Sequence, residues 1–201
     1  MADDPYERFQ RSFLGDVQAA LRDGLDEPAL LALRGDARDR AERELLARAE
    51  DDGRAVVGLG LLRSAAALPK LRPRFEHLYR DDDPGDRELV TLALALWRIE
   101  RLAEAPAALG DVATHGRFPV DRASAAEALA HVDAPEAQGH LLEALDDDDP
   151  QVRRAAARSL LQGSGLLAPD APTPPMVLDA MNPSPARRTA GASAVRRAVG
   201  A

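Results

Sequence analysis

The sequence predicts an all-α protein, a right-handed α-solenoid of stacked helical hairpins. Four arginines (Arg54, Arg87, Arg122 and Arg153) are each followed by mostly small or apolar residues three, four and seven positions later, and they are spaced 33, 35 and 31 residues apart. Those offsets lie on one face of a helix, and a period of this length fits a pair of helices. Ala and Leu dominate the composition and only seven residues are aromatic, which favours close-packed helices over a sheet.

Residues 1–50 are expected to form N-terminal capping helices, whose number the sequence leaves open. Apolar residues at three- and four-residue steps predict a first helix over 5–23, with Asp4 as its N-cap. Phe9 and Phe13 lie on the apolar face of this helix. We interpret them as sealing the end of the solenoid, because terminal repeats need a cap; the alternative is an aromatic anchor for a partner.

Residues 51–184 are expected to hold the repeats and residues 185–201 a basic C-terminal helix or tail, all within a single domain. The pattern places helices at residues 53–64, 66–80, 103–114, 120–132, 135–146 and 185–199. The insert Gly163–Pro175 contains four prolines and is expected to displace the second helix of the fourth hairpin. Pro73 predicts a kink or a helix in two pieces, whereas Gly60 would admit a close neighbour.

Two runs of aspartate, Asp81–Asp83 and Asp146–Asp149, each precede the start of a helix. Oxygen ligands suit calcium or magnesium, but neither run has the alternating spacing, central glycine and downstream glutamate of a calcium loop. Aspartate in this place accepts hydrogen bonds from the free N–H groups of the helix and meets the positive end of its dipole. We therefore interpret both runs, Asp149 above all, as helix caps and expect no metal site.

The arginine at each repeat origin is interpreted as structural. An Asp before a helix and an Arg a few residues later, copied in successive hairpins, can form a ladder of hydrogen bonds, because guanidinium offers five donors in a planar fork. The expected ladder residues are Arg54, Arg87, Arg122, Arg153 and Asp149.

One copy of this pattern carries a family resemblance. It is the segment Asp148-Asp149-Pro150-Gln151-Val152-Arg153-Arg154-Ala155-Ala156-Ala157. This segment closely resembles the start of a HEAT repeat of the bacterial, bilin-lyase-like type. The resemblance covers residues 51–162 well, 185–199 loosely and 1–50 poorly. It implies a HEAT-like solenoid in which the Asp and Arg residues belong to the scaffold and take no part in catalysis.

No catalytic signature accompanies the repeats. The sequence has no cysteine, no Gly-x-Ser-x-Gly elbow, no phosphate-binding loop and no His-Glu-x-x-His motif. Some HEAT-like enzymes bind iron through repeated His-Glu pairs, but the one adjacent pair here, Glu76-His77, is reversed and single. We expect a protein that is not an enzyme and uses no cofactor. The alternative is a bilin-lyase-like accessory enzyme or chaperone.

The charge favours a basic protein partner. The net charge is −8, and residues 185–201 hold four arginines and no acid, so residues 1–184 carry 22 basic against 34 acidic groups. Phosphate backbones repel such a body, so we expect no nucleic-acid partner. Two functions remain open for a protein that binds a basic partner: an immunity-type inhibitor of a cationic toxin, and an adaptor in a bacterial assembly.

The second helix of each hairpin is expected to line the concave face, as in HEAT proteins. Outward residues of these helices predict the partner-binding surface, and they are Arg74, His77, Asp111, His115, His140 and Glu143. The three histidines stand at different offsets from the repeat origins, so we interpret them as solvated and not as metal ligands. Trp97 is interpreted as a core residue or a filler between repeats, and the alternative is a binding hot spot.

Four leucines, each seven residues after a repeat origin, are expected to be deeply buried. They are Leu61, Leu94, Leu129 and Leu160. No signal peptide is visible at the N-terminus, and no apolar run reaches the roughly 18 residues that a membrane-spanning helix needs. We therefore expect a cytoplasmic monomer.

Overall fold

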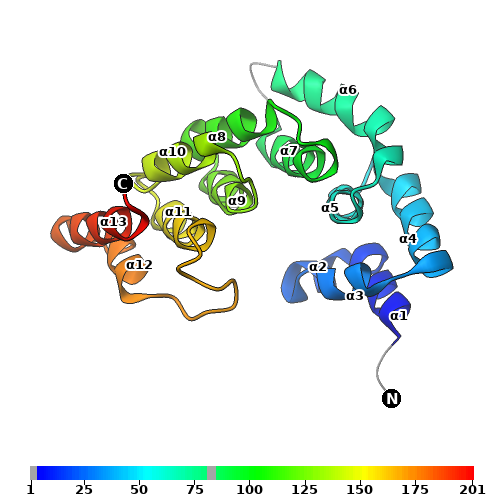
Figure 1. The fold of residues 1–201 in the computed structure, drawn as a ribbon, viewed down its shortest axis with the longest axis horizontal. Helices are drawn as coiled ribbons and strands as arrows, with labels where there is room; N and C mark the ends of the chain where they lie inside the picture. The colour runs from blue at the N-terminus through cyan, green and yellow to red at the C-terminus, as the bar shows by residue number, and fades with distance from the viewer. Residues whose placement is uncertain (1–3, 81–84) are drawn as a thin grey trace. The chain divides into compact units, whose positions relative to one another are not determined.

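The computed structural model describes residues 4–80 and 85–201, and this part of the chain is helical throughout, without a strand (Figure 1). The all-α class and the succession of packed helices are thus confirmed. The right hand of the solenoid stays a prediction, and the predicted caps Asp81–Asp83 lie outside the described residues.

The chain divides into two compact units. The first holds Met1–Pro84 and Thr91–Leu102, and the second holds Gly85–Val90 and Ala103–Ala201. Helix α7 (Asp86–Glu100) therefore contributes to both. This division does not follow the three segments expected from the sequence, and the single-domain organisation stays a prediction.

The first unit is a series of short and medium helices. They are α1 (Pro5–Phe9), α2 (Val17–Asp23), α3 (Glu27–Ala32), α4 (Gly35–Arg48), α5 (Gly53–Leu62), α6 (Leu68–Tyr79) and the larger part of α7. The single helix expected over 5–23 is wrong. Asp4 caps α1 as predicted, accepting from the N–H of Tyr6 at 3.1 Å, but a π-helical stretch follows and ends at Gly15. A Cβ at Gly15 would overlap the carbonyl of Arg11, so only glycine fits this turn.

The phenylalanines of the N-terminal segment belong to the core. Phe9 and Phe13 are both fully buried, with ring centroids 5.6 Å apart. A Cβ added to Gly58 of α5 would touch the side chains of Leu45 and Phe13. Since buried rings cannot meet a partner, the partner-anchor alternative is wrong, and the two rings close the core beneath α5.

Two details of the first unit concern Gly60 and Pro73. Gly60 lies against the backbone of Ala95, 2.8 Å from where its Cβ would stand, so α5 and α7 approach closely, as predicted. Helix α6 begins after a 3₁₀ turn and runs through Pro73 without dividing. The expectation of two pieces is wrong, because Leu71 and Phe75 are both buried and hold the residues on either side of the proline in one packed helix.

The second unit consists of six further helices and the first residues of α7. The helices are α8 (Ala105–His115), α9 (Pro119–Leu129), α10 (Pro135–Ala144), α11 (Pro150–Gly163), α12 (Pro175–Ala180) and α13 (Pro185–Val199). The last five begin with proline, whose fixed φ and missing N–H suit the first helical position. Helices α9, α11 and α13 pack in order as one layer, and α8 packs on α10 in a second (Figure 1).

The burial of the four leucines differs between the repeats. Leu129 and Leu160 are buried, at 1% and 3% exposure, as predicted. The prediction is wrong for Leu61 and Leu94, which are half-buried, while their neighbours Leu62 and Ala95 lie in the core. The buried faces of α5 and α7 are thus displaced by one residue from the expected position, a rotation of roughly 100° about the helix axis.

Candidate functional site

Arg122 and Arg153 hold successive repeats together through matching contacts. Arg122 donates from Nε and Nη2 to the carboxylate of Asp147, at 2.7 and 3.0 Å, and from Nη1 to the carbonyl of Gly116, at 2.9 Å. Arg153 donates to the carbonyl of Asp147, at 2.7 Å, and to that of Ala180, at 2.7 Å. Each guanidinium therefore binds the loop before its own helix and, beyond that helix, the C-terminal end of the following helix or the loop after it.

The other two arginines make different contacts. Arg54 forms a pair with Asp52 in its own helix start, at 2.8 Å, and donates to the carbonyl of Gly15, at 3.0 Å, on the N-terminal side. Arg87 lies 3.3 Å from Asp121, but its side chain is 72% exposed. Arg54 thus joins its helix to a preceding segment, and Arg87 makes a solvent-screened contact with α9.

The aspartates before α11 have separate tasks. The carboxylate of Asp149 accepts from the N–H groups of Gln151 and Val152, at 2.7 and 3.4 Å, and is the N-cap of the helix. The carboxylate of Asp147 accepts from the N–H of Asp149, at 2.7 Å, in addition to Arg122. Asp146 pairs with Arg196 of α13, at 2.6 Å. The carboxylates of this run therefore bind backbone N–H groups at the start of α11 and the guanidinium groups of two arginines.

The pKa values of Arg122 and Arg153 shift in opposite directions. The hydrogen bond to Asp147 raises the pKa of Arg122. Burial lowers the pKa of Arg153, and the nearby charge of Arg188 acts in the same direction. Arg153 is only 2% exposed. Its charge is stabilised mainly by carbonyl dipoles, so this arginine is part of the core of the second unit.

The six residues of the predicted partner surface fall into both units. Arg74 and His77 lie on α6 of the first unit, whereas Asp111, His115, His140 and Glu143 lie on α8 and α10 of the second. Arg74 is half-buried and donates to the carbonyl of Ala49 at the end of α4. Asp111 and His115 are exposed and pair along α8 at 3.1 Å. Of the six, only the members on α8 and α10 share one packed layer.

His140 is not the solvated surface histidine that the sequence predicts. It is half-buried, and its ring occupies the space where a Cβ at Gly110 would stand. The ring therefore fills the contact between α10 and α8, and Gly110 is needed there because any side chain would collide with it. The prediction that His140 points outward from α10 is therefore wrong.

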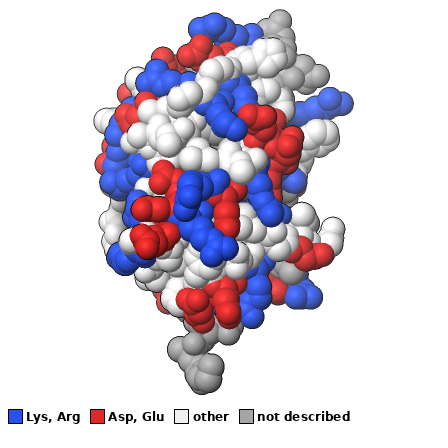
Figure 2. All heavy atoms as spheres, turned by 90° about the vertical axis from the view of Figure 1, so that its right-hand side faces the viewer, with Lys and Arg blue, Asp and Glu red and all other residues white. Residues whose placement is uncertain are grey.

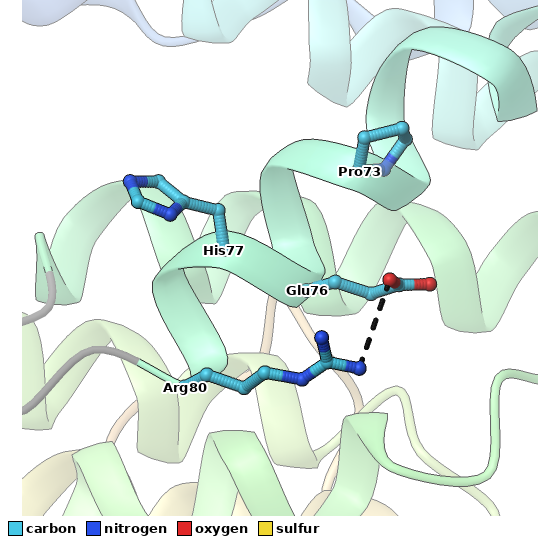
Figure 3. Close-up of a pocket in the computed structure, with 4 residues that line it drawn as sticks. All are labelled: Pro73, Glu76, His77 and Arg80. Atoms are coloured by element: carbon cyan, nitrogen blue, oxygen red, sulfur yellow. Dashed lines mark ion pairs between the residues drawn. The ribbon is translucent and has the colours of Figure 1, made fainter.

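A shallow hollow on α6 is lined by Pro73, Glu76, His77 and Arg80. Figure 3 shows Glu76 and Arg80 one helical turn apart, with an ion pair of 3.8 Å, while His77 points to another side of the helix. All four residues come from one helix and are exposed. The carboxylate and imidazole do not converge on a common point, so this hollow presents no acid–base pair.

The surface seen around α4 and α6 carries both signs of charge. Figure 2 shows arginines and acids interspersed over this face of the first unit. Ion pairs account for much of the mixture, among them Arg72 with Glu100 at 2.7 Å and Lys70 with Glu50 at 3.0 Å. The acidic excess lies elsewhere, because residues 103–150 contain eleven acidic residues and two arginines.

A second hollow, of about 350 Å³, lies between α9, α10 and α11. Its apolar lining comprises Leu129, Val132, Ala137, Leu141 and Leu160, and we call it the α9–α11 hollow. The sequence did not predict this hollow, because its apolar lining residues are buried and repeat periodicity assigns them to the core. The proline-rich insert is the one sequence signal that could have pointed to it.

Neither a metal cluster nor a membrane-spanning helix is found in residues 4–80 and 85–201. No three His, Cys, Asp or Glu side chains of these residues gather in a way that could hold a metal ion. None of their helices combines the length and apolar character needed to cross a bilayer.

These observations define a helical-repeat protein whose repeats are joined by a polar ladder. Residues 106–196 match the family model of HEAT repeats. The match confirms the family predicted from the sequence, whereas the bilin-lyase-like subtype stays a prediction. HEAT repeats serve in general as scaffolds for protein interactions. No curated protein and no solved structure matches the chain significantly.

Proposed function

We propose that this protein is a non-enzymatic scaffold that binds a basic protein partner through the surface of α8 and α10. The observation that carries the proposal is the charge of residues 103–150, eleven acids against two arginines. Most of these acids are exposed: Glu104, Asp111, Glu127, Asp133, Glu136, Glu143, Asp146 and Asp148. Such a surface attracts a cationic partner and accelerates its association.

The non-enzymatic part of the proposal is supported by the HEAT-repeat match, since these repeats usually serve as interaction scaffolds. Within the proposal, the protein is a cytoplasmic monomer that acts either as an inhibitor covering a cationic site or as an adaptor. An inhibitor abolishes the partner's activity at equal concentration, whereas an adaptor leaves that activity intact and recruits a third protein.

The test compares two pairs of charge reversals in affinity purification followed by binding kinetics. Asp111→Lys with Glu143→Lys changes exposed acids of α8 and α10; Asp39→Lys with Asp51→Lys changes exposed acids of the first unit and is the matched control. We expect the first pair to lose a basic partner that the wild type and the control retain, at equal melting temperatures. The association rate should fall as salt rises. Equal retention by both pairs would contradict the proposal.

A further inference from the structure

Three leucines on neighbouring helices of the first unit stay partly exposed. Leu31 of α3 is 46% exposed, and Leu61 of α5 and Leu94 of α7 are half-buried. Helix α5 packs against α3, and Gly60 of α5 lies against the backbone of Ala95 of α7. Figure 1 shows α5 between the other two helices. The three leucines therefore come from three adjacent helices, with α5 in the middle.

The leucines of α5 and α7 lie on the same side of the contact between these helices. Helix α6 separates them in the chain and runs back between them, so α5 and α7 run in the same direction. Leu61 follows Gly60 by one residue, whereas Leu94 precedes Ala95 by one residue. In parallel helices, these opposite steps of roughly 100° bring both leucines to one side. Their side chains therefore form one apolar surface.

A charged side chain stands one helical turn from each of the two outer leucines. Glu27 precedes Leu31 by four residues, and Arg98 follows Leu94 by four, so each charge shares a helix face with its leucine. Both charged side chains are half-buried. The charge of Glu27 acts on Arg98, so the two faces are turned toward the same region. We call these residues the α3–α7 strip: Glu27, Leu31, Leu61, Leu94 and Arg98.

The two charges of the α3–α7 strip are unpaired. Within residues 4–80 and 85–201, neither Glu27 nor Arg98 makes a hydrogen bond or an ion pair, with each other or with any other residue. Burial lowers the pKa of Arg98, and the charge of Glu27 offsets this only in part. By contrast, Arg72 of α6 pairs with Glu100 at 2.7 Å. A carboxylate brought to Arg98 by a ligand would gain a charge-assisted hydrogen bond.

We propose that the α3–α7 strip binds an extended segment of a second protein, in which apolar residues stand between a basic and an acidic residue. The basic residue pairs with Glu27, the acidic residue pairs with Arg98, and the apolar side chains cover the leucines. This site lies in the first unit. It goes beyond the proposed binding on α8 and α10 and does not depend on it.

The dimensions of the strip fit an extended segment. Neighbouring helix axes lie about 9 Å apart, so α3 and α7 are separated by roughly 18 Å. An extended chain covers this distance with about six residues, and its alternate side chains point to one face. A basic residue, two apolar residues and an acidic residue at every second position would therefore meet the strip in register.

The experiment titrates the full chain into a fluorescein-labelled peptide, Lys-Ser-Leu-Ser-Leu-Ser-Glu, whose ends are blocked. When the peptide is extended, its lysine, leucines and glutamate point to one side and span roughly 20 Å. Fluorescence anisotropy measures binding. We expect saturable binding, and at least about tenfold weaker binding when serine replaces both leucines or when glutamate replaces the lysine.

A change of peptide preference locates the site on the protein. Arg98→Glu makes both ends of the strip acidic. We expect this variant to bind the first peptide at least about tenfold more weakly than the wild type does, and to bind a peptide with lysine at both ends more tightly. Unfolding cannot produce a gain for one peptide together with a loss for the other.

Arg154→Glu is the matched control for this change. Arg154 of α11 is also half-buried, and it makes no hydrogen bond or ion pair in the described part of the chain. Because it belongs to the second unit, its reversal should change the affinity for either peptide less than about twofold.

Three results would overturn the inference: no saturation of the first peptide at roughly millimolar protein, equal affinity for the peptide without leucines, or the same peptide preference in Arg98→Glu as in Arg154→Glu. The scaffold proposal is judged separately, by the reversals of Asp111 and Glu143 in the second unit. The two proposals can therefore fail independently.

Discussion

Arg87 and Arg122 stand at the same place in the repeat pattern, yet they have unequal structural roles. Arg122 is largely buried and is forked onto Asp147, whereas the side chain of Arg87 is 72% exposed. Arg87 is the second residue of α7, but Arg122 is the fourth of α9, one half-turn deeper in its helix. The repeat motif therefore marks the start of a helix, whereas burial of the arginine depends on the residue at which that helix begins.

The largest expected difference concerns the core leucines of the two units. Leu129→Ala should lower the free energy of unfolding by roughly 2–5 kcal/mol, because a fully buried side chain leaves a cavity. Leu61→Ala should cost about 1 kcal/mol, since this side chain is half-exposed and water replaces part of it. Urea denaturation followed by circular dichroism measures both, and equal losses would show that the assigned burial is wrong.

The next difference concerns the arginines themselves. Arg122→Leu should destabilise by about 2–3 kcal/mol, because it leaves the carboxylate of Asp147 buried beside an apolar side chain. Arg87→Leu should cost less than about 0.5 kcal/mol, as is usual for exposed pairs. A double-mutant cycle of Arg122 with Asp147 should give a coupling of at least about 1 kcal/mol. A coupling near zero would show that the contact between Arg122 and Asp147 contributes no more to stability than an exposed ion pair.

A smaller effect is expected at the helix caps. Asp149→Ala should cost about 1 kcal/mol, because two N–H groups of α11 lose their acceptor, while Asp149→Asn should cost less. Neither change should alter binding of a basic partner to α8 and α10 by more than about twofold. Calorimetry and binding kinetics on the same samples measure both properties. Unchanged stability with lost binding would place Asp149 in the interface.

The smallest effect is a pH dependence in the first unit. Burial raises the pKa of Asp52, but hydrogen bonds from Arg54 outweigh it and hold the pKa below its ordinary value of about 3.9. The carboxylate is therefore stabilised by folding, and its contribution is present above that ordinary value and lost as pH falls through the depressed pKa. Stability curves between neutral pH and pH 2 should be shallower for Asp52→Asn. Identical slopes would contradict this.

The sequence predicted helix boundaries well where nearby residues, such as a proline or an N-cap, mark the start of the helix. The last helix was expected at 185–199 and is Pro185–Val199, and the N-cap Asp4 was found from its position before a proline. The phase of α5 was missed because this helix is apolar on nearly all sides. No polar face marks its orientation, so the choice between Leu61 and Leu62 depends on contacts with α4 and α7.

The candidate site was harder to predict, because its main features depend on residues far apart in the sequence. His140 fills the space above Gly110 because α10 packs on α8, and these two residues are thirty positions apart in the chain. The α9–α11 hollow depends on how three helices meet, and periodicity describes the faces of one helix at a time. Charge, by contrast, sums over a segment, and so the acidic surface of residues 103–150 could be found from the sequence.

Asp147 serves two repeats with different atoms of one residue. Its carboxylate binds Arg122 of α9, and its carbonyl binds Arg153 of α11. Under a stretching force along the chain, tension on either helix passes through this residue to the other. We expect single-molecule pulling to extend α9, α10 and α11 in one step, and to release them one hairpin at a time once Asp147→Ala removes the carboxylate.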